Sequence, residues 1–411
     1  MRFDNRAVPM ALAAVLIDTI GFGIVMPVFP GLITRIGHID LEQGTRVAGY
    51  MLVIYAATQF FAGPVLGNLS DRFGRRPVLA ASMLAFGLDY ALMAWAPTLA
   101  WLFLGRAIAG AAGAVYGPAG SVIADSTPPE KRGGSFALIG AAFGIGFVIG
   151  PALGGLIAHW GVRAPFIAAA TLALVNAGMM AAFMPETLKP ENRRAFRPRD
   201  AHIVASFKPL FTAGNAAPLL IVAFVWQIAH LVLPSTWAFW GAIRFGWSAQ
   251  TIGWSLAFVG LSMAIVQGGL TGRAIGAMGE RRALMIGLAA AGLSFLGYAF
   301  VTREWQVWPI LAFSAFQGFV FPATQGLMSR MVDPTRQGAL QGGIGSLGSV
   351  SAIIAPLTMT QVMAAGVDRG FPGTAFLLAA VLAFAAMALV AWKVFAPANP
   401  PLQGEVAVRQ D

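Results

Sequence analysis

The chain has 411 residues, of which 57% are hydrophobic and 11% are charged, against roughly 25% charged in an ordinary soluble domain. It has no cysteine, so it has no disulfide framework and no cysteine metal site. Uncharged runs of twenty or more residues recur along it, each long enough to cross about 30 Å of hydrocarbon. This composition predicts a polytopic membrane protein and excludes a soluble enzyme, a disordered binder and a nucleic-acid-binding protein.

The apolar runs predict an all-α chain with twelve membrane-spanning helices in two sets of six. The first set is expected near residues 7–32, 46–66, 77–96, 99–123, 133–158 and 164–184, and the second near 217–240, 249–272, 283–302, 305–329, 337–365 and 371–395. The first run is too long for a signal-peptide core and has no cleavage site, so we expect it to stay as a span. The domains are then an N-terminal half (1–184), a linker (185–216), a C-terminal half (217–395) and a tail (396–411).

The linker is the one long polar stretch between spans. Two interpretations stand side by side: a solvated connection, or a short helix that lies on the membrane surface. The apolar residues that would face the membrane in such a helix are Phe196, Ile203, Val204, Phe207 and Phe211.

The net charge of +10 indicates orientation. Twenty of the 27 Lys and Arg residues fall in the termini, the linker and the loops on the same side, against six in the opposite loops. By the positive-inside rule, this excess predicts that both termini are cytoplasmic. The charge is therefore not taken as a sign of nucleic-acid binding.

The two sets of six spans also repeat one another. Four pairs of matching residues are separated by 204 or 205 positions: Pro118 and Pro322, Arg132 and Arg336, Pro151 and Pro356, and Gly74 and Gly279. Two six-helix halves of the same orientation are typical of transporters that alternate access to a site between the halves.

The segment from Gly67 to Pro77, after the second span, resembles the loop signature of the major facilitator superfamily. Its glycines permit a tight turn, and Asp71 can pair with a neighbouring Arg or accept hydrogen bonds at a helix end. The resemblance implies a gating loop, and a topology anchor is the plainer interpretation. The residues of this loop are Gly67, Asp71, Arg72, Gly74, Arg75 and Arg76.

The fifth span contains small residues at four-residue spacing, which let helices approach closely in lipid. Packing alone explains most such glycines. Gly-Pro followed by Gly-Gly also resembles the superfamily's antiporter motif, which implies drug/proton exchange. The residues concerned are Gly146, Gly150, Pro151, Gly154 and Gly155.

The resemblance narrows to the tetracycline/proton antiporters, in the drug/proton antiporter branch of this superfamily. It covers both halves and rests on five stretches: Asp18 to Pro30, Leu88 to Tyr90, Leu104 to Arg106, Ser121 to Asp125, and Gln337 to Gly342. The sequence departs from these antiporters at two places, where their His in helix 8 and Asp in helix 9 are Met263 and Ala291 here. This departure leaves open whether tetracycline itself is transported and how many protons are exchanged.

Ionisable groups at membrane depth are costly and are functional candidates by default. Asp18, Asp89 and Arg106 fall at a similar depth in the first half, at 1.5 Å rise per residue. We expect Asp18 to bind and release the coupled proton and Arg106 to tune it. A structural role is the alternative for Asp89, and His230 either relays a proton, binds substrate or is simply hydrogen-bonded.

By the family resemblance, the first, fourth, seventh and tenth spans line the substrate cavity, and Gln59 of the second span is added to the set. Aromatic faces with scattered amides suit a flat, amphipathic ligand, although aromatic stripes are also ordinary packing. The candidate substrate-binding residues are Phe22, Gln59, Arg106, Tyr116, Gln227, His230, Trp237, Phe316, Gln317, Phe321 and Gln325.

These observations predict a proton-coupled antiporter in the inner (cytoplasmic) membrane that exports a hydrophobic or amphipathic small molecule, such as a tetracycline-like drug, by alternating access. The expected partners are the substrate, protons and the bilayer. We expect a working monomer with no nucleic acid, no metal, no cofactor beyond the proton gradient and no catalytic residue. The alternatives are a symporter or uniporter of a metabolite or lipid-like compound, and a membrane sensor that transports nothing.

Overall fold

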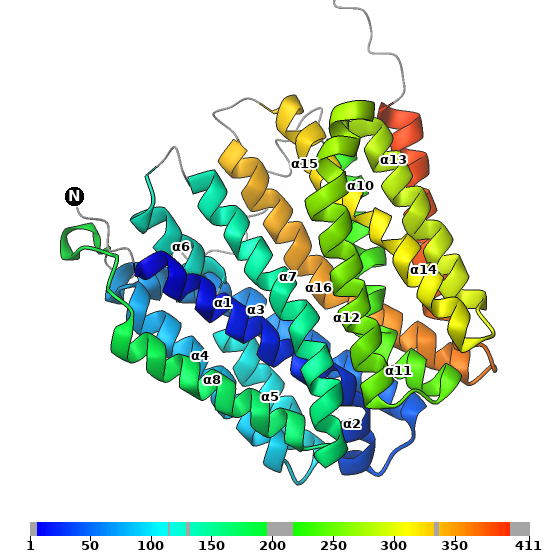
Figure 1. The fold of residues 1–411 in the computed structure, drawn as a ribbon, viewed down its shortest axis with the longest axis horizontal. Helices are drawn as coiled ribbons and strands as arrows, with labels where there is room; N and C mark the ends of the chain where they lie inside the picture. Colours follow the sequence, from blue (N-terminus) through cyan, green and yellow to red (C-terminus); the bar gives the residue numbers. More distant parts are fainter. Residues whose placement is uncertain (1–5, 114–115, 129–131, 195–216, 333–336, 395–411) are drawn as a thin grey trace, which may run out of the picture.

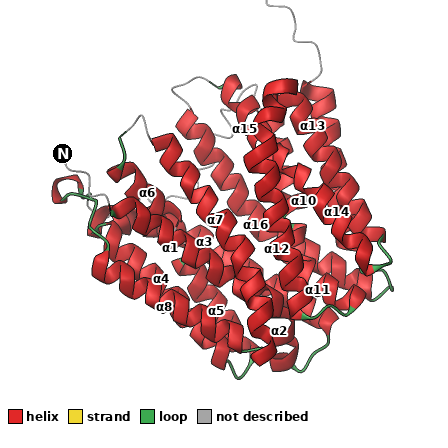
Figure 2. Ribbon diagram, in the orientation of Figure 1, coloured by secondary structure: helices red, strands yellow, loops and turns green. Residues whose placement is uncertain are grey.

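A computed structural model describes residues 6–113, 116–128, 132–194, 217–332 and 337–394. All regular structure in these ranges is helical, and no strand occurs in them (Figure 2). Eleven stretches of the described residues are long and apolar enough to cross a membrane. The chain is thus a multi-pass membrane protein. The predicted surface helix within 196–211 and the tail 396–411 lie outside the described residues.

The first half is built from a series of helices that run in alternate directions (Figure 1). They are α1 (Ala7–Val25), η1 (Met26–Val28), α2 (Phe29–Gly37), α3 (Leu41–Phe73), α4 (Arg75–Trp95), α5 (Leu99–Ala112), α6 (Tyr116–Ser126), α7 (Arg132–Ile157), η3 (Ala158–Trp160), α8 (Ala164–Phe183) and η4 (Pro190–Asn192).

The second half follows the same plan. Its elements are α10 (Ala217–His230), α11 (Val232–Phe245), α12 (Ala249–Ile265), η7 (Val266–Leu270), α13 (Thr271–Phe300), η8 (Glu304–Gln306), α14 (Val307–Ser314), η9 (Ala315–Phe319), α15 (Val320–Met331), α16 (Gln337–Val367), α17 (Thr374–Leu389) and η11 (Val390–Val394).

The first and seventh spans are longer than predicted, and both are interrupted by proline. Pro27 and Pro30 divide the first span into α1, η1 and α2, and the span continues to Gly37, where His38 adopts a left-handed cap with φ 50°. Pro234 separates α10 from α11 because it has no N–H to donate to the carbonyl of His230. The chain thus keeps its membrane crossings while their axes are broken near mid-span.

The prediction of a loop from Gly67 to Pro77 is largely wrong, because α3 continues to Phe73 and α4 begins at Arg75. Gly74 alone makes the reversal, with φ 107°, a value that favours glycine. In the second half Gly279, at the repeat position, has φ 79° and ψ 160° within α13. The 52 residues from Ala249 to Phe300 therefore appear as one stretch, and the count of twelve spans stays a prediction.

Two helix pairs join the halves, α3 with α16 and α7 with α12. The face from which the linker leaves α8 is called the linker face here, and the opposite one the distal face. On the distal side the pairs are tight: a Cβ on Gly253 of α12 would collide with the carbonyl of Pro151 in α7. On the linker side a Cβ on Gly144 of α7 or Gly345 of α16 would meet nothing within 4 Å. The halves converge near α2 and α11 and spread toward the linker face (Figure 1).

Candidate substrate and coupling site

A pocket between the halves, called the midplane pocket below, lies where the proline-broken helices meet. The first half contributes the α1–α2 region, α3, α4 and α5, and the second half contributes α11 and α12. The lining residues are Phe22, Val25, Met26, Phe29, Pro30, Ala48, Leu52, Tyr90, Arg106, Pro234, Ser235, Trp237, Ala238, Phe239 and Leu256. Its walls are thus mostly apolar and aromatic with few polar groups, which is typical of sites for small organic ligands.

The charged group of this pocket, Arg106, is already paired. Its guanidinium forms a buried ion pair with Asp89, and it lies 5.7 Å from the centre of the Tyr55 ring. Asp89 is fully buried, and its Oδ1 has no hydrogen-bond partner among the described residues. A Cβ on Gly105 would collide with Asp89 Oδ1, so this glycine lets α5 approach α4. The structure therefore joins two of the three charges predicted to form a network.

Asp18 lies on α1, one turn before the pocket residue Phe22. Its side chain is partly buried and makes no ion pair or hydrogen bond within the described part of the chain. Arg106 pairs with Asp89 instead, so the expected tuning of Asp18 by Arg106 stays a prediction. Asp18 is left as the unpaired carboxylate beside the midplane pocket.

Tyr90 is a pocket residue that sequence reasoning missed. It directly follows Asp89, it lines the midplane pocket together with Arg106, and its ring would be 3.5 Å from a Cβ on Gly21 of α1. It therefore lies between the helix that carries Asp18 and the buried ion pair. Its position directly after Asp89 in the sequence could have identified Tyr90 as a candidate.

The predicted substrate residues of the first half have mixed environments. Phe22 lines the midplane pocket and is 38% exposed. Gln59 donates to the backbone carbonyl of Gly113 at 2.9 Å and so caps the end of α5. The side chain of Tyr116 lies outside the described residues.

Trp237 has two kinds of neighbour. It lines the midplane pocket, and its Nε1 donates to Ser255 at 2.8 Å. The rest of its ring packs into an aromatic cluster at the distal end of the second half. The ring-centre distances from Trp237 are 5.1 Å to Trp240, 5.9 Å to Trp247, 5.2 Å to Tyr298 and 6.2 Å to Phe376. Trp237 is therefore mainly a packing residue with one edge at the pocket.

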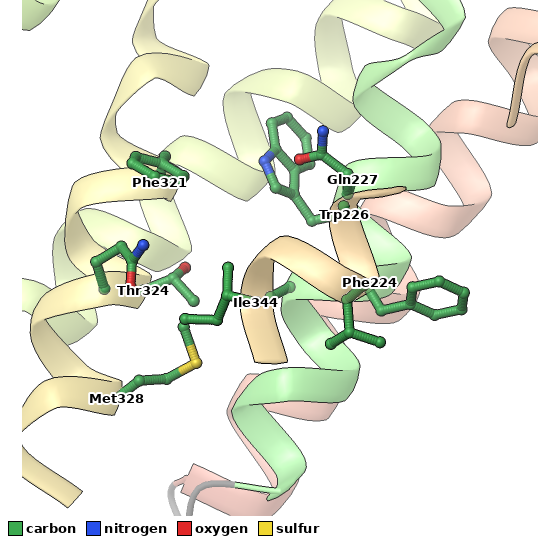
Figure 3. Close-up of a pocket in the computed structure, with 11 residues that line it drawn as sticks. Phe224, Trp226, Gln227, Phe321, Thr324, Met328 and Ile344 are labelled. Carbon is green, nitrogen blue, oxygen red and sulfur yellow. The ribbon is translucent and has the colours of Figure 1, made fainter. Parts of the chain in front are cut away.

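Three predicted substrate residues gather in a separate pocket within the second half, called the second-half pocket below. Gln227 comes from α10, and Phe321 and Gln325 come from α15 (Figure 3). The full lining is Ala223, Phe224, Trp226, Gln227, Phe321, Thr324, Gln325, Met328, Ile344, Leu347 and Gly348. The structure thus divides the predicted substrate set between two places.

The remaining predicted residues lie between these two pockets. His230 Nδ1 and Gln317 Oε1 are 3.2 Å apart, and the His230 ring packs against Trp226 with ring centres 5.3 Å apart and planes tilted by 35°. Gln317 is buried, and Phe316 packs against Phe319. His230 is thus hydrogen-bonded, as the plainer alternative expected, and its relay role stays a prediction.

The predicted gating residues form a polar cluster at the linker face. Arg75 bonds Asp71 at 2.6 Å and Asp125 at 3.1 Å, so it joins α3, α4 and α6. Glu186, which the sequence analysis did not select, accepts from the backbone N–H groups of Arg75 at 2.9 Å and Arg76 at 3.3 Å. A carboxylate at a helix N-terminus is stabilised by the orphan N–H groups there.

This cluster also explains the rest of the gating motif. A Cβ on Gly74 would collide with the Glu186 carboxylate, while one on Gly67 would meet nothing within 4 Å. Arg72 lies over the Phe73 ring at 5.0 Å, and Arg76 donates to the carbonyl of Ala181. These partners belong to the first half except Glu186, which lies at the start of the linker. The cluster therefore ties the linker to the first half, and its gating role stays a prediction.

The glycines predicted to form an antiporter helix make close helix contacts. Cβ atoms on Gly146, Gly150 and Gly154 would collide with α1, and one on Gly155 would lie 3.0 Å from the Ala249 carbonyl of α12. The helix α7 therefore packs closely on both halves along glycine. The packing interpretation holds, and the link to exchange stays a prediction.

The distal face carries the one ion pair that joins the halves among pairs of described residues. Arg46 of α3 bonds Asp368, after α16, at 2.7 Å and Glu42 at 3.0 Å. Gln361 also donates to the carbonyl of Arg46 at 3.2 Å. The Arg46–Asp368 pair is part-exposed, at 35% and 47% of the two side chains, and it marks the closed side of the molecule.

A model of the Major Facilitator Superfamily matches residues 11–356, and a further match covers residues 242–409. The chain belongs to this superfamily. Among its relatives, the class C tetracycline resistance protein of Escherichia coli is 42% identical over 383 residues, covering 92% of this chain and 95% of the relative. The class B protein of Escherichia coli is 36% identical, covering 87% and 88%.

Two solved transporter structures share the fold over almost the whole chain. The nucleoside transporter NupG aligns with a TM-score of 0.74 at 16% identity, covering 95% of this chain and 99% of NupG. The human organic anion transporter MFSD10 aligns with a TM-score of 0.70 at 24% identity, covering 95% and 100%. Membership of this transporter superfamily confirms the predicted resemblance and places the chain among transporters rather than enzymes.

Within this superfamily protein, the two positions that depart from the tetracycline/proton antiporters are apolar. Met263 lies on α12, partly buried against the core, and Ala291 is fully buried on α13. Among the described residues, the midplane and second-half pockets therefore receive no carboxylate from the second half. The described residues of the first half also line neither pocket with a carboxylate, so Asp18 and Asp89 lie outside the wall of the midplane pocket.

Proposed function

We propose that this superfamily member is a proton-coupled antiporter that exports a hydrophobic or amphipathic small molecule by alternating access. The observation that carries the proposal is Asp18, which lies deep in α1 beside the midplane pocket and has no cation partner among the described residues. An ionisable group at this depth is a functional candidate because membrane burial of a charge is costly. Asp89 is occupied by Arg106, so Asp18 is the group that can carry the proton.

The proposed topology has twelve spans, with the linker face and both termini in the cytoplasm and the protein in the inner membrane. The excess of Lys and Arg in the termini, linker and neighbouring loops supports it. In that orientation the described state is closed to the outside and open to the cytoplasm. The chain works as a monomer and uses the proton gradient in place of a cofactor. A membrane potential of 100 mV offers about 2.3 kcal/mol per charge, or about a 50-fold substrate gradient from one proton.

The substrate class follows from the pocket walls and the relatives. Phe22, Phe29, Tyr90 and Phe239 offer aromatic faces, which suit a flat ring system. Relatives are a class C tetracycline resistance protein and, at 24% identity, multidrug resistance protein 2 of Bacillus subtilis (strain 168). A tetracycline-like drug is therefore the first substrate to test.

The test is tetracycline flux in liposomes with an imposed pH gradient. We expect flux driven by the gradient and alkalinisation of the proton-rich compartment. In Asp18→Asn the driven flux should disappear while tetracycline binding remains. Glu304→Gln, which removes an exposed carboxylate at the distal face, is the matched control and should transport normally. Driven flux in Asp18→Asn would contradict the role of Asp18, gradient-independent flux would indicate a uniporter, and binding without flux would indicate a sensor.

A further inference from the structure

The second-half pocket is separate from the midplane pocket. Its lining comes from α10, α15 and α16 alone, and no residue lines both pockets. Gln227 in one and Pro234 in the other are seven residues apart, about 10 Å along a helix axis. The second-half pocket lies on the linker side of the midplane pocket, because α10 runs from the linker face toward the distal face.

The seventh span lines both pockets, the tenth span lines the second-half pocket, and both spans have an irregular segment next to that pocket. The seventh span breaks at Leu231, between α10 and α11, and the tenth span changes to the 3₁₀ segment η9, Ala315–Phe319. A 3₁₀ stretch inside a longer helix often marks a hinge. The hydrogen bond between His230 and Gln317 joins the two irregular segments. We call this contact the partition, because His230 lies along the seventh span between Gln227 of one pocket and Pro234 of the other.

The second-half pocket has the chemistry of a ligand site. The ring of Phe321 lies on the α15 side of the pocket, and the ring of Trp226 and the amide of Gln227 lie on the α10 side (Figure 3). The backbone carbonyl of Gln227 accepts from the N–H of Leu231, but its side-chain amide makes no hydrogen bond within the described part of the chain. Phe321 is 62% exposed, and the lining contains no ionisable residue. This set favours a flat, uncharged or zwitterionic ring system that offers a polar group to an amide.

The size and opening of the pocket define how such a ligand would sit. The cavity is about 40 Å³, far below the several hundred Å³ of a site for a drug-sized molecule, so it admits only the edge of a ring. Gly348 lines it, and a Cβ there would meet nothing within 4 Å. The rest of the ligand can thus lie in the open space on the linker side, while one ring edge enters between Phe321 and Trp226.

We propose that the second-half pocket is an entry subsite that holds a flat amphipathic molecule before it passes the His230–Gln317 partition to the midplane pocket. The inference rests on the proposed function for its direction, since the linker face must be cytoplasmic for the subsite to be an entrance. It assigns Gln227 as the polar contact and Phe321 as the stacking contact of that subsite.

The absence of cysteine from the chain allows a direct test by thiol alkylation. Gly348→Cys places a single thiol in the pocket, and Gly345→Cys places one on the same helix, in open space but outside the lining. We expect tetracycline to slow alkylation of Gly348→Cys at least fivefold and to leave Gly345→Cys unchanged. Unchanged rates at both would overturn the subsite, and equal protection at both would show general closure of the linker face instead.

A second variant tests the assigned contact. Gln227→Leu keeps the side-chain size and removes the amide, so the tetracycline concentration that half-protects Gly348→Cys should rise about tenfold, close to the loss of one hydrogen bond. An unchanged half-protecting concentration would overturn the role of Gln227. In Asp18→Asn the protection should persist while driven flux is lost. Protection without any proton-driven flux in the otherwise unaltered chain would keep the subsite and overturn the proposed antiport.

Discussion

The two halves repeat one fold but place different chemistry at mid-span. The first half holds a buried ion pair, Arg106 with Asp89, and the unpaired Asp18. At comparable depth the second half holds the neutral contact between His230 and Gln317 and the aromatic cluster around Trp237. Buried charge is costly unless it is paired or functional. The difference supports the proposal that coupling belongs to the first half, and that the second half supplies rings and amides to a ligand.

The largest effect is expected from removing Arg106, the cation of the buried ion pair in the first half. Arg106→Leu leaves Asp89 buried without its partner, which should cost about 3–5 kcal/mol of the free energy of unfolding. Thermal unfolding in detergent micelles measures it. The double variant Arg106→Leu with Asp89→Leu should recover most of that stability, because no uncompensated charge remains. If Arg106→Leu alone were as stable as the unaltered protein, the first half would not depend on its buried ion pair, and the contrast with the second half would fail.

The next largest effect is expected from glycine substitutions at the two ends of α7, one near the distal face and one near the linker face. Gly155→Ala places a methyl group 3.0 Å from the Ala249 carbonyl of α12 in the other half and should cost about 1–3 kcal/mol. Gly144→Ala lies on the same helix, where a Cβ meets nothing within 4 Å, and should be close to neutral. Unfolding midpoints of the two variants give the comparison, and equal losses would contradict a closed distal side and an open linker side.

A smaller effect is expected for the neutral contact of the second half. Gln317→Leu removes the partner of His230 and should cost about 1 kcal/mol, well below the effect of Arg106→Leu. Gln341→Leu, which loses only an exposed amide pair with Gln325, is the control and should change stability little. If Gln317→Leu proved as damaging as Arg106→Leu, the halves would be equally dependent on their buried polar groups.

The smallest effect concerns the ion pair between the halves at the distal face. Arg46→Gln removes a part-exposed pair, and such pairs are worth less than about 1 kcal/mol. The population open at the distal face should therefore rise by up to about fivefold, measured by spin-label distances between introduced cysteines. Raised salt should mimic the substitution, because exposed charges are screened. A conformational shift insensitive to salt would exclude this pair as the cause.

Hydropathy and glycine patterns predicted much of the fold. Apolar runs placed the spans to within several residues. The repeat at 205 positions paired Gly74 with Gly279, and the structure gives both glycines a positive φ. The extension of α3 to Phe73 was missed because helices continue past the apolar run into polar residues.

The candidate site was only partly predictable. The sequence set Asp18, Asp89 and Arg106 at one depth, but which carboxylate Arg106 bonds depends on how α1, α4 and α5 are rotated about their axes. The division of Phe22 and Gln227 between two pockets depends on where proline breaks the seventh span. Arg46 and Asp368 are 322 residues apart, and no local pattern predicts their contact.

The glycine faces of α7 bear on how the halves can move. Gly146, Gly150 and Gly154 present backbone to α1, while Gly155 and the carbonyl of Pro151 lie against α12. Where glycine faces backbone, few side chains interlock, so α12 can shift over α7 with little steric obstruction. If the halves rock as proposed, resistance falls on the ionic and aromatic contacts of the distal face. A bulky residue at Gly155 would then stop the cycle without contacting the substrate or the proton-binding group.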